Sequence, residues 1–129
     1  MHELSIACEL VELVEKSARD AGADGVLTVR LRLGMLAGVE IEALRMGYLT
    51  ATEATLLQGA RLEIEETAVR GWCVQCGLQR EPLDVQWLAC PDCGSPLADL
   101  QGGREIEVTS IELTIPETIE ENQYVHSPA

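Results

Sequence analysis

Two short cysteine pairs in the second half of the chain constrain its folding more than any other feature. Cys73 and Cys76 form one Cys-x-x-Cys pair, Cys90 and Cys93 form the other, and a glycine directly follows each pair. This spacing lets two thiolates reach one ion from a single tight turn, and the glycine lets the backbone curl so that amides point at sulfur. Two such turns complete a tetrahedral four-sulfur site. The sequence therefore predicts a metal centre at Cys73, Cys76, Cys90 and Cys93.

The predicted centre is closed, because four thiolates leave no coordination position open for a substrate. We therefore expect a structural ion, and Zn(II) is the default occupant. Iron is the competing occupant, since Cys-Pro-x-Cys-Gly turns also occur in rubredoxin-like electron carriers, where aromatic side chains pack around the metal. Only Trp72 and Trp87 are available for such packing here. The cysteine-rich stretch is too short to bury a core, so we expect the ion to fold it.

The charge of the chain opposes a nucleic-acid-binding role, which small cysteine-ligated modules often have. The 129 residues include 9 Lys and Arg against 22 Asp and Glu, a net charge of −13. Phosphate binding needs clustered basic side chains, and residues 1–70, 71–103 and 104–129 are each acidic. An acidic surface suits cations or a basic protein partner instead. A zinc-ribbon module for nucleic acid or the transcription machinery is thus an alternative that the charge disfavours.

Hydrophobic periodicity predicts an α/β (α+β) fold, in which two helices lie on a three-stranded mixed sheet. Apolar residues at helical spacing predict helices over residues 3–21 and 40–49. Period-two alternation predicts strands over residues 26–33, 61–69 and 104–115. The alternation of the last strand changes phase, which predicts a β-bulge near Thr109 and Ser110. Cys8 lies on the apolar stripe of the first helix, and we expect it in the core.

Composition divides the chain into three expected parts. Residues 1–70 and 103–116 are expected to form a discontinuous α/β domain. Residues 71–102 are expected to form a zinc-ribbon insert between the last two strands, because this stretch is rich in cysteine, glycine and proline. Residues 117–129 are polar and acidic, include His126, and are expected to form a mobile tail.

The sequence also indicates where the protein works. No apolar run is long enough to cross a membrane, and the opening residues lack the basic and apolar regions of a secretory signal. We therefore expect a cytoplasmic protein with no membrane partner, in which paired cysteines bind metal instead of forming disulfides. The chain has neither a G-x-x-x-x-G-K-[ST] nucleotide loop nor a G-x-S-x-G elbow, and we expect no enzyme.

The first three residues form a second candidate metal site. The α-amine of Met1, the backbone nitrogen of His2 and its ring nitrogen can bind one ion in fused chelate rings. Glu3 can add its amide nitrogen or its carboxylate. Nitrogen donors in a plane are what Ni(II) or Cu(II) favours, and binding depends on pH because each donor must lose a proton. Taken alone this pattern is weak, since a second-position histidine is most often solvated and Glu3 fits a first-turn helix carboxylate.

Several segments together resemble the HypA/HybF family of nickel metallochaperones, which act in hydrogenase maturation. The resemblance covers Met1-His2-Glu3-Leu4-Ser5, Gly34 to Glu40, Gln58 to Ile64, the two cysteine pairs, and the strand from Glu105 to Glu112. These segments span nearly all of residues 1–113 in the family's order and spacing. The N-terminal triplet and the cysteine pairs are independent features, which makes the match specific.

The resemblance implies a carrier that binds Ni(II) at its N-terminus and delivers it to the large subunit of [NiFe] hydrogenase. In the family, the residue matching His2 is essential for nickel, and the amide of the residue matching Glu3 contributes. An acidic residue at the position of Glu40 lies near the nickel in some members, whereas the sequence alone makes Glu40 a helix-start carboxylate. The family's partner is the GTPase HypB, and urease maturation, with its accessory proteins, can share the pathway.

Overall fold

The computed structural model describes residues 2–116. Met1 and residues 117–129, which include the predicted tail and His126, lie outside the described residues. The described elements are α1 (His2–Asp20), β1 (Gly25–Gly34), α2 (Ile41–Ala51), β2 (Arg61–Thr67), β3 (Arg70–Cys73), β4 (Leu78–Arg80), β5 (Ala98–Gln101) and β6 (Ile106–Thr114). They pack into two compact units. The first unit contains α1, α2 and most of β1 and β6, and the second contains residues 32–38 and 65–107.

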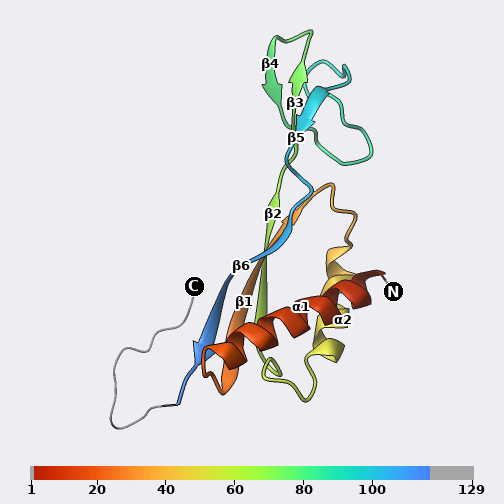
Figure 1. Ribbon diagram of the computed structural model, residues 1–129. Coiled ribbons are helices and arrows are strands. Elements are labelled where there is room, and N and C mark those ends of the chain that lie inside the picture. The colour runs from red at the N-terminus through yellow and green to blue at the C-terminus, as the bar shows by residue number, and fades with distance from the viewer. Residues whose placement is uncertain (1, 117–129) are drawn as a thin grey trace. The chain divides into compact units, whose positions relative to one another are not determined.

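The predicted three-stranded sheet is present, with strand order β2-β1-β6. Arg30 of β1 pairs with Glu63 of β2, and Arg32 pairs with Glu65, so the partners advance together and β2 runs parallel to β1. The partners of the same two arginines on β6 run in the opposite order, so β6 is antiparallel to β1. The sheet is therefore mixed, as the sequence predicted. Helix α2 connects the two parallel strands, as such a connection requires (Figure 1).

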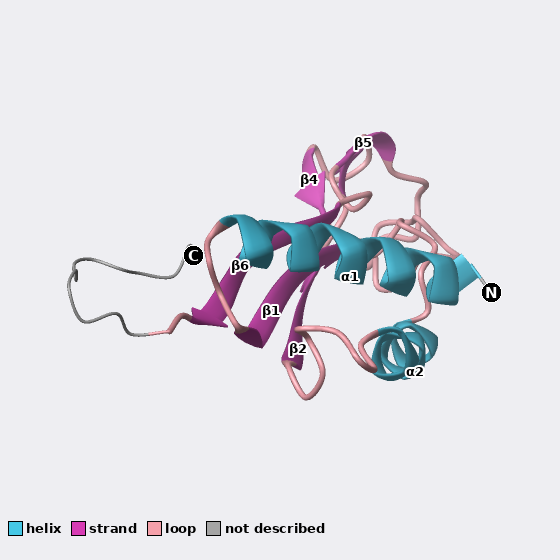
Figure 2. Ribbon diagram, turned by 60° about the horizontal axis from the view of Figure 1, so that its bottom comes forward, coloured by secondary structure: helices cyan, strands magenta, loops and turns pink. Residues whose placement is uncertain are grey.

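Helix α1 lies across the strands (Figure 2) and buries one stripe of its surface. Its buried residues are Ala7, Leu10, Val11, Val14 and Ala18. The expectation that Cys8 lies in the core is wrong, because its side chain is exposed. Each helical residue advances by about 100°, so Cys8 lies a quarter turn beyond Ala7 and leaves the buried stripe.

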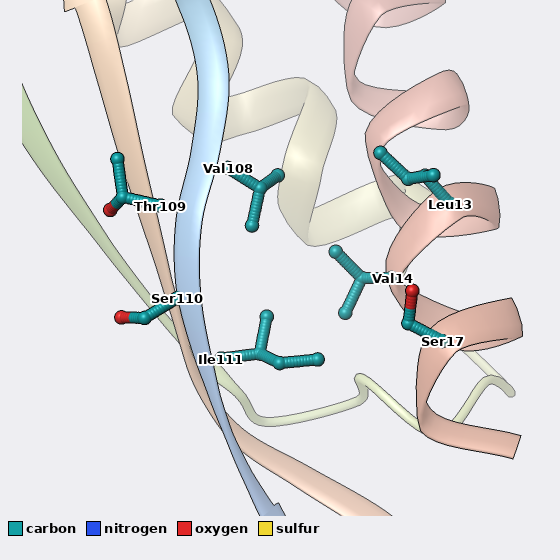
Figure 3. A pocket seen from close by; sticks show the side chains of 7 residues that line it. All are labelled: Leu13, Val14, Ser17, Val108, Thr109, Ser110 and Ile111. Atoms are coloured by element: carbon teal, nitrogen blue, oxygen red, sulfur yellow. The ribbon is translucent and has the colours of Figure 1, made fainter. Parts of the chain in front are cut away.

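The predicted β-bulge in β6 is confirmed. Val108 and Ile111 both point towards α1, whereas the two residues between them, Thr109 and Ser110, both point away (Figure 3). The Thr109 hydroxyl donates to the backbone oxygen of Arg30 at 3.3 Å, and the Arg30 guanidinium donates to the Ser110 hydroxyl at 3.2 Å. Two successive residues of β6 thus face the same way, which is the break in alternation that a bulge produces.

The second unit contains a smaller sheet of order β4-β3-β5, inserted in the chain between β2 and β6. Strand β3 pairs antiparallel with both neighbours, with Cys73 opposite Leu78 on β4 and Trp72 opposite Ala98 on β5. The predicted insert between the last two strands of the body is therefore present, and it carries the four clustered cysteines. Among the described helices, none is both long and apolar enough to cross a membrane.

Candidate metal centres

The four cysteines predicted from the sequence converge in the second unit. The Sγ atoms of Cys73, Cys76, Cys90 and Cys93 all lie within 4.8 Å of one another. The distance is 3.5 Å between Cys73 and Cys93 and 3.8 Å between Cys76 and Cys90. A tetrahedral ion with metal–sulfur bonds of about 2.3 Å holds its sulfur ligands about 3.8 Å apart. The four thiols therefore fit one four-coordinate ion.

Both cysteine pairs bend in the same way, for the reason that the sequence suggested. The backbone nitrogen of Gly77 donates to the Cys73 carbonyl at 2.8 Å, and that of Gly94 donates to the Cys90 carbonyl at 2.9 Å. The φ angles of these glycines are 71° and 79°, a region that side chains other than glycine rarely adopt. The turn also directs the backbone nitrogen of Cys76 at the Cys73 sulfur, 3.3 Å away. Local sequence thus forms each half of the site.

The sulfur cluster packs against one buried aliphatic side chain. Cys73 and Cys90 are buried together with Leu97, and Cys76 packs against them. The side chain of Trp72 lies on the opposite face of β3 from that of Cys73, because successive strand residues alternate in direction. The side chain of Trp87 is 74% exposed. The aromatic packing expected of a rubredoxin-like centre is therefore not supplied by Trp87, which faces solvent.

The thiols of the cluster differ in acidity. The side chain and backbone of Ser95 hydrogen-bond the Cys93 sulfur and lower the pKa of this thiol to about 6. Hydrogen bonds with the other three thiols, Cys73 first, raise the pKa of Cys76 to about 12. A metal ion needs all four as thiolates, so binding releases protons and the affinity of the site falls in acid.

The second candidate site lies at the start of α1, in the first unit. The His2 side chain is 61% exposed, and its Nδ1 atom lies 3.8 Å from Glu3 Oε2. The same carboxylate oxygen accepts a hydrogen bond from the backbone nitrogen of Glu40 at 3.1 Å. This bond lowers the pKa of Glu3, so the carboxylate is charged. The structure thereby joins the first turn of α1 to the segment that begins α2.

Glu40 lies at the start of α2, as the sequence alone predicted. It is the N-cap of α2, and its Oε1 accepts a hydrogen bond from the backbone nitrogen of Ala43 at 2.9 Å. This satisfies one of the backbone donors that the first turn of a helix leaves without a partner. The contact between Glu3 and Glu40 was not predicted, because nothing in the local sequence marks two residues 37 positions apart.

Close packing of the helices holds this arrangement. A Cβ atom added to Gly47 of α2 lies only 3.2 Å from Leu4 Cα and 3.5 Å from the carbonyl oxygen of Glu3. Glycine at this position therefore lets the first turn of α1 approach α2 closely. His2 and Glu3 belong to that first turn, where backbone N–H groups have no intrahelical acceptor. Their amide nitrogens can become metal ligands without breaking a helical hydrogen bond.

Comparison with known proteins identifies the family. The family described as "Hydrogenase/urease nickel incorporation, metallochaperone, hypA" matches residues 1–113. The chain belongs to the HypA family. The HypA hydrogenase maturation factor of Roseiflexus sp. is 45% identical over 112 residues, which are 87% of this chain and 91% of that protein. The HypA of Polaromonas naphthalenivorans is 43% identical over 108 residues, covering 84% and 93% of the two chains.

Solved HypA structures share the fold. The solution structure of the Ni metallochaperone HypA from Helicobacter pylori aligns with a TM-score of 0.60 at 23% identity, covering 88% of this chain and 98% of that one. A second HypA solution structure aligns with a TM-score of 0.62 at 24% identity, covering 90% and 98%. The predicted HypA fold, with two helices, a mixed sheet and a four-cysteine insert, is confirmed.

Proposed function

We propose that this protein is a nickel metallochaperone, which binds Ni(II) at its N-terminus and delivers it to the large subunit of [NiFe] hydrogenase. It is a carrier and catalyses no reaction. The observation that carries the proposal is the contact of His2 with a charged Glu3 that is bonded to the start of α2, in a chain of the HypA family.

The proposed nickel ligands are nitrogen atoms of the first three residues. The Met1 α-amine, the His2 backbone nitrogen and the His2 ring nitrogen form two fused chelate rings around Ni(II). The Glu3 carboxylate already accepts the Glu40 N–H, so we propose that any donor from Glu3 is its amide nitrogen. Deprotonated nitrogen ligands suit Ni(II). Because the donors must lose protons, the affinity rises with pH.

Glu40 is proposed to lie near the nickel without binding it. Its Oε1 atom is already engaged by the Ala43 N–H of the α2 N-cap, while its backbone nitrogen fixes the Glu3 carboxylate. Glu40 then acts by holding Glu3 in place. A charged carboxylate beside the ion also favours the cation electrostatically.

The four-cysteine site is proposed to hold Zn(II) permanently as a structural ion. Its closed tetrathiolate set leaves no position for exchange, whereas His2 is exposed at the start of α1, so nickel held there can pass stepwise to a partner's ligands. The two sites thus have different roles: the four-cysteine site stabilises the fold, and the N-terminal site exchanges its ion.

The proposed partners are a HypB-like GTPase and the hydrogenase large subunit, with urease accessory proteins as a second route for the same nickel. The net charge of −13 favours protein partners with basic contact surfaces.

Calorimetric titration with Ni(II) tests the proposal. We expect the wild type to bind Ni(II) at mildly alkaline pH, and we expect His2→Ala to abolish binding. Adding one residue before Met1 moves the α-amine out of its chelate ring while keeping the imidazole, and weakens binding. The matched control is His126→Ala, which changes the other histidine of the chain. Unchanged binding in both N-terminal variants would refute the nickel site.

A further inference from the structure

One loop of the second unit exposes apolar side chains to an unusual degree. Within five residues, Leu83 is 82% exposed, Val85 is 43% exposed and Trp87 is 74% exposed. Single exposed apolar residues are common on protein surfaces, but a group of them marks an interaction site. Tryptophan in particular is enriched among the residues that contribute most to binding at protein interfaces. We refer to residues 83–87 as the apolar loop.

The apolar loop has a defined conformation. The side chain of Asp84 accepts hydrogen bonds from the backbone nitrogens of Gln86 and Trp87, both at 2.9 Å. Pro82, directly before the loop, is buried. Because this turn is fixed before a partner arrives, binding through the loop loses little conformational entropy.

The loop also forms one side of an open groove of about 400 Å³. Leu83 and Val85 line it together with Met35, Thr67, Ala68 and two acidic residues, Glu66 and Asp84. Within residues 2–116, neither acidic side chain forms an ion pair with Lys or Arg. The groove thus combines apolar walls with uncompensated negative charge.

Charge decides which kind of occupant fits. The second unit, residues 32–38 and 65–107, contains eight Asp and Glu against four Arg, and the guanidinium of Arg80 is bound to Asp92. A second copy of the chain, an anionic lipid surface and a nucleic acid would all bring negative charge to this surface and be repelled. Lysine and arginine suit the groove, because their aliphatic stems can lie along Leu83 and Val85 while the charged ends meet the carboxylates.

We propose that the apolar loop and its groove form a docking surface for a partner protein whose contact face is apolar and bordered by lysine or arginine. Trp87 inserts into the apolar part of that face, and a basic side chain of the partner occupies the groove. The identity of the partner rests on the proposed function, which names the HypB-like GTPase and the hydrogenase large subunit. None of the proposed nickel ligands belongs to the loop or the groove.

The test measures binding of the zinc-loaded protein to each purified partner separately. We expect at least one partner to bind the wild type, Leu83→Ser to weaken that binding at least tenfold, and Glu66→Lys to do the same. The matched control is Leu49→Ser, since Leu49 of α2 is also highly exposed, at 69%, but belongs to the first unit. Zinc content and circular dichroism report whether each variant is folded, and higher salt should weaken wild-type binding.

The proposal is overturned if Leu83→Ser and Glu66→Lys bind as well as Leu49→Ser does, or if the wild type binds neither partner. These outcomes are separable from failure of the nickel proposal, because Ni(II) titration of Leu83→Ser should match the wild type. Loss of docking with nickel binding intact leaves the N-terminal site standing. Absence of nickel binding in the wild type removes the carrier role whatever the docking result.

Discussion

Removing the metal from the four-cysteine site should unfold residues 70–101 and leave the first unit folded. This stretch, which the structure describes completely, has almost no core besides the sulfur ligands. Apart from Gly71, its buried residues are Cys73, Cys90, Pro82 and Leu97. The strands that surround the site are only three or four residues long, so their hydrogen bonds cannot hold the segment alone.

The expected magnitude follows from this composition. Burial of Leu97 contributes about 1.5–3 kcal/mol, whereas a structural zinc ion contributes about 10–16 kcal/mol to the folding of small domains near pH 7. Small domains have a total stability of about 5–15 kcal/mol. The free energy of folding lost with the ion is therefore at least as large as the total stability expected of the segment. Without the ion, its folded population should become negligible.

Amide hydrogen exchange read by nuclear magnetic resonance, before and after treatment with a chelator, measures this effect by segment. We expect residues 70–101 to lose protection and α1 and β1 to keep it. Replacing Cys73 and Cys90 by serine should reproduce the result without a chelator. The control is Cys8→Ser, which changes an exposed cysteine of α1 and should change neither exchange nor zinc content. Retained protection of residues 70–101 in the metal-free protein would refute the reasoning.

Three further predictions concern the first unit. Leu44→Ala, at a fully buried position, should lower the free energy of unfolding by about 2–5 kcal/mol, whereas Leu49→Ala at an exposed position should change it by less than about 0.5 kcal/mol; urea titration checks both. The Arg30 guanidinium lowers the pKa of Glu112 below its ordinary value of 4.5. The stability that this pair contributes is therefore fully present above pH 4.5 and is lost as the pH falls through the lowered pKa of Glu112. The urea midpoints of the wild type and Arg30→Met should therefore differ more at pH 7 than in acid; an equal difference would contradict this. Glu40→Ala removes the N-cap of α2 and should cost about 0.5–2 kcal/mol, seen as a lower melting temperature. Glu40→Gln keeps a capping oxygen and removes only the charge, so it should weaken nickel binding much less than His2→Ala does.

The sequence by itself determined the features that depend on neighbouring residues. The spacing of each cysteine pair and the glycine after it dictate one tight turn, and both turns have the predicted form. The phase change in the last strand predicted the bulge at Thr109 and Ser110, because alternation can change phase only if an extra residue is accommodated. Periodicity likewise placed the helices and strands of the α/β body to within a few residues.

Only the tertiary structure decided which surfaces meet. Cys8 fitted a helical stripe in the sequence, but the packing of α1 on the sheet buries a narrower stripe and leaves Cys8 exposed. The bond between the Glu3 carboxylate and the Glu40 backbone has no local signal, because it depends on how two helices pack at Gly47. The pairing of Arg30 with two acidic residues on different strands depends in the same way on strand order. The physical reason is that turns and periodicity follow from the covalent geometry of a few successive residues, whereas these contacts form only when distant segments pack together.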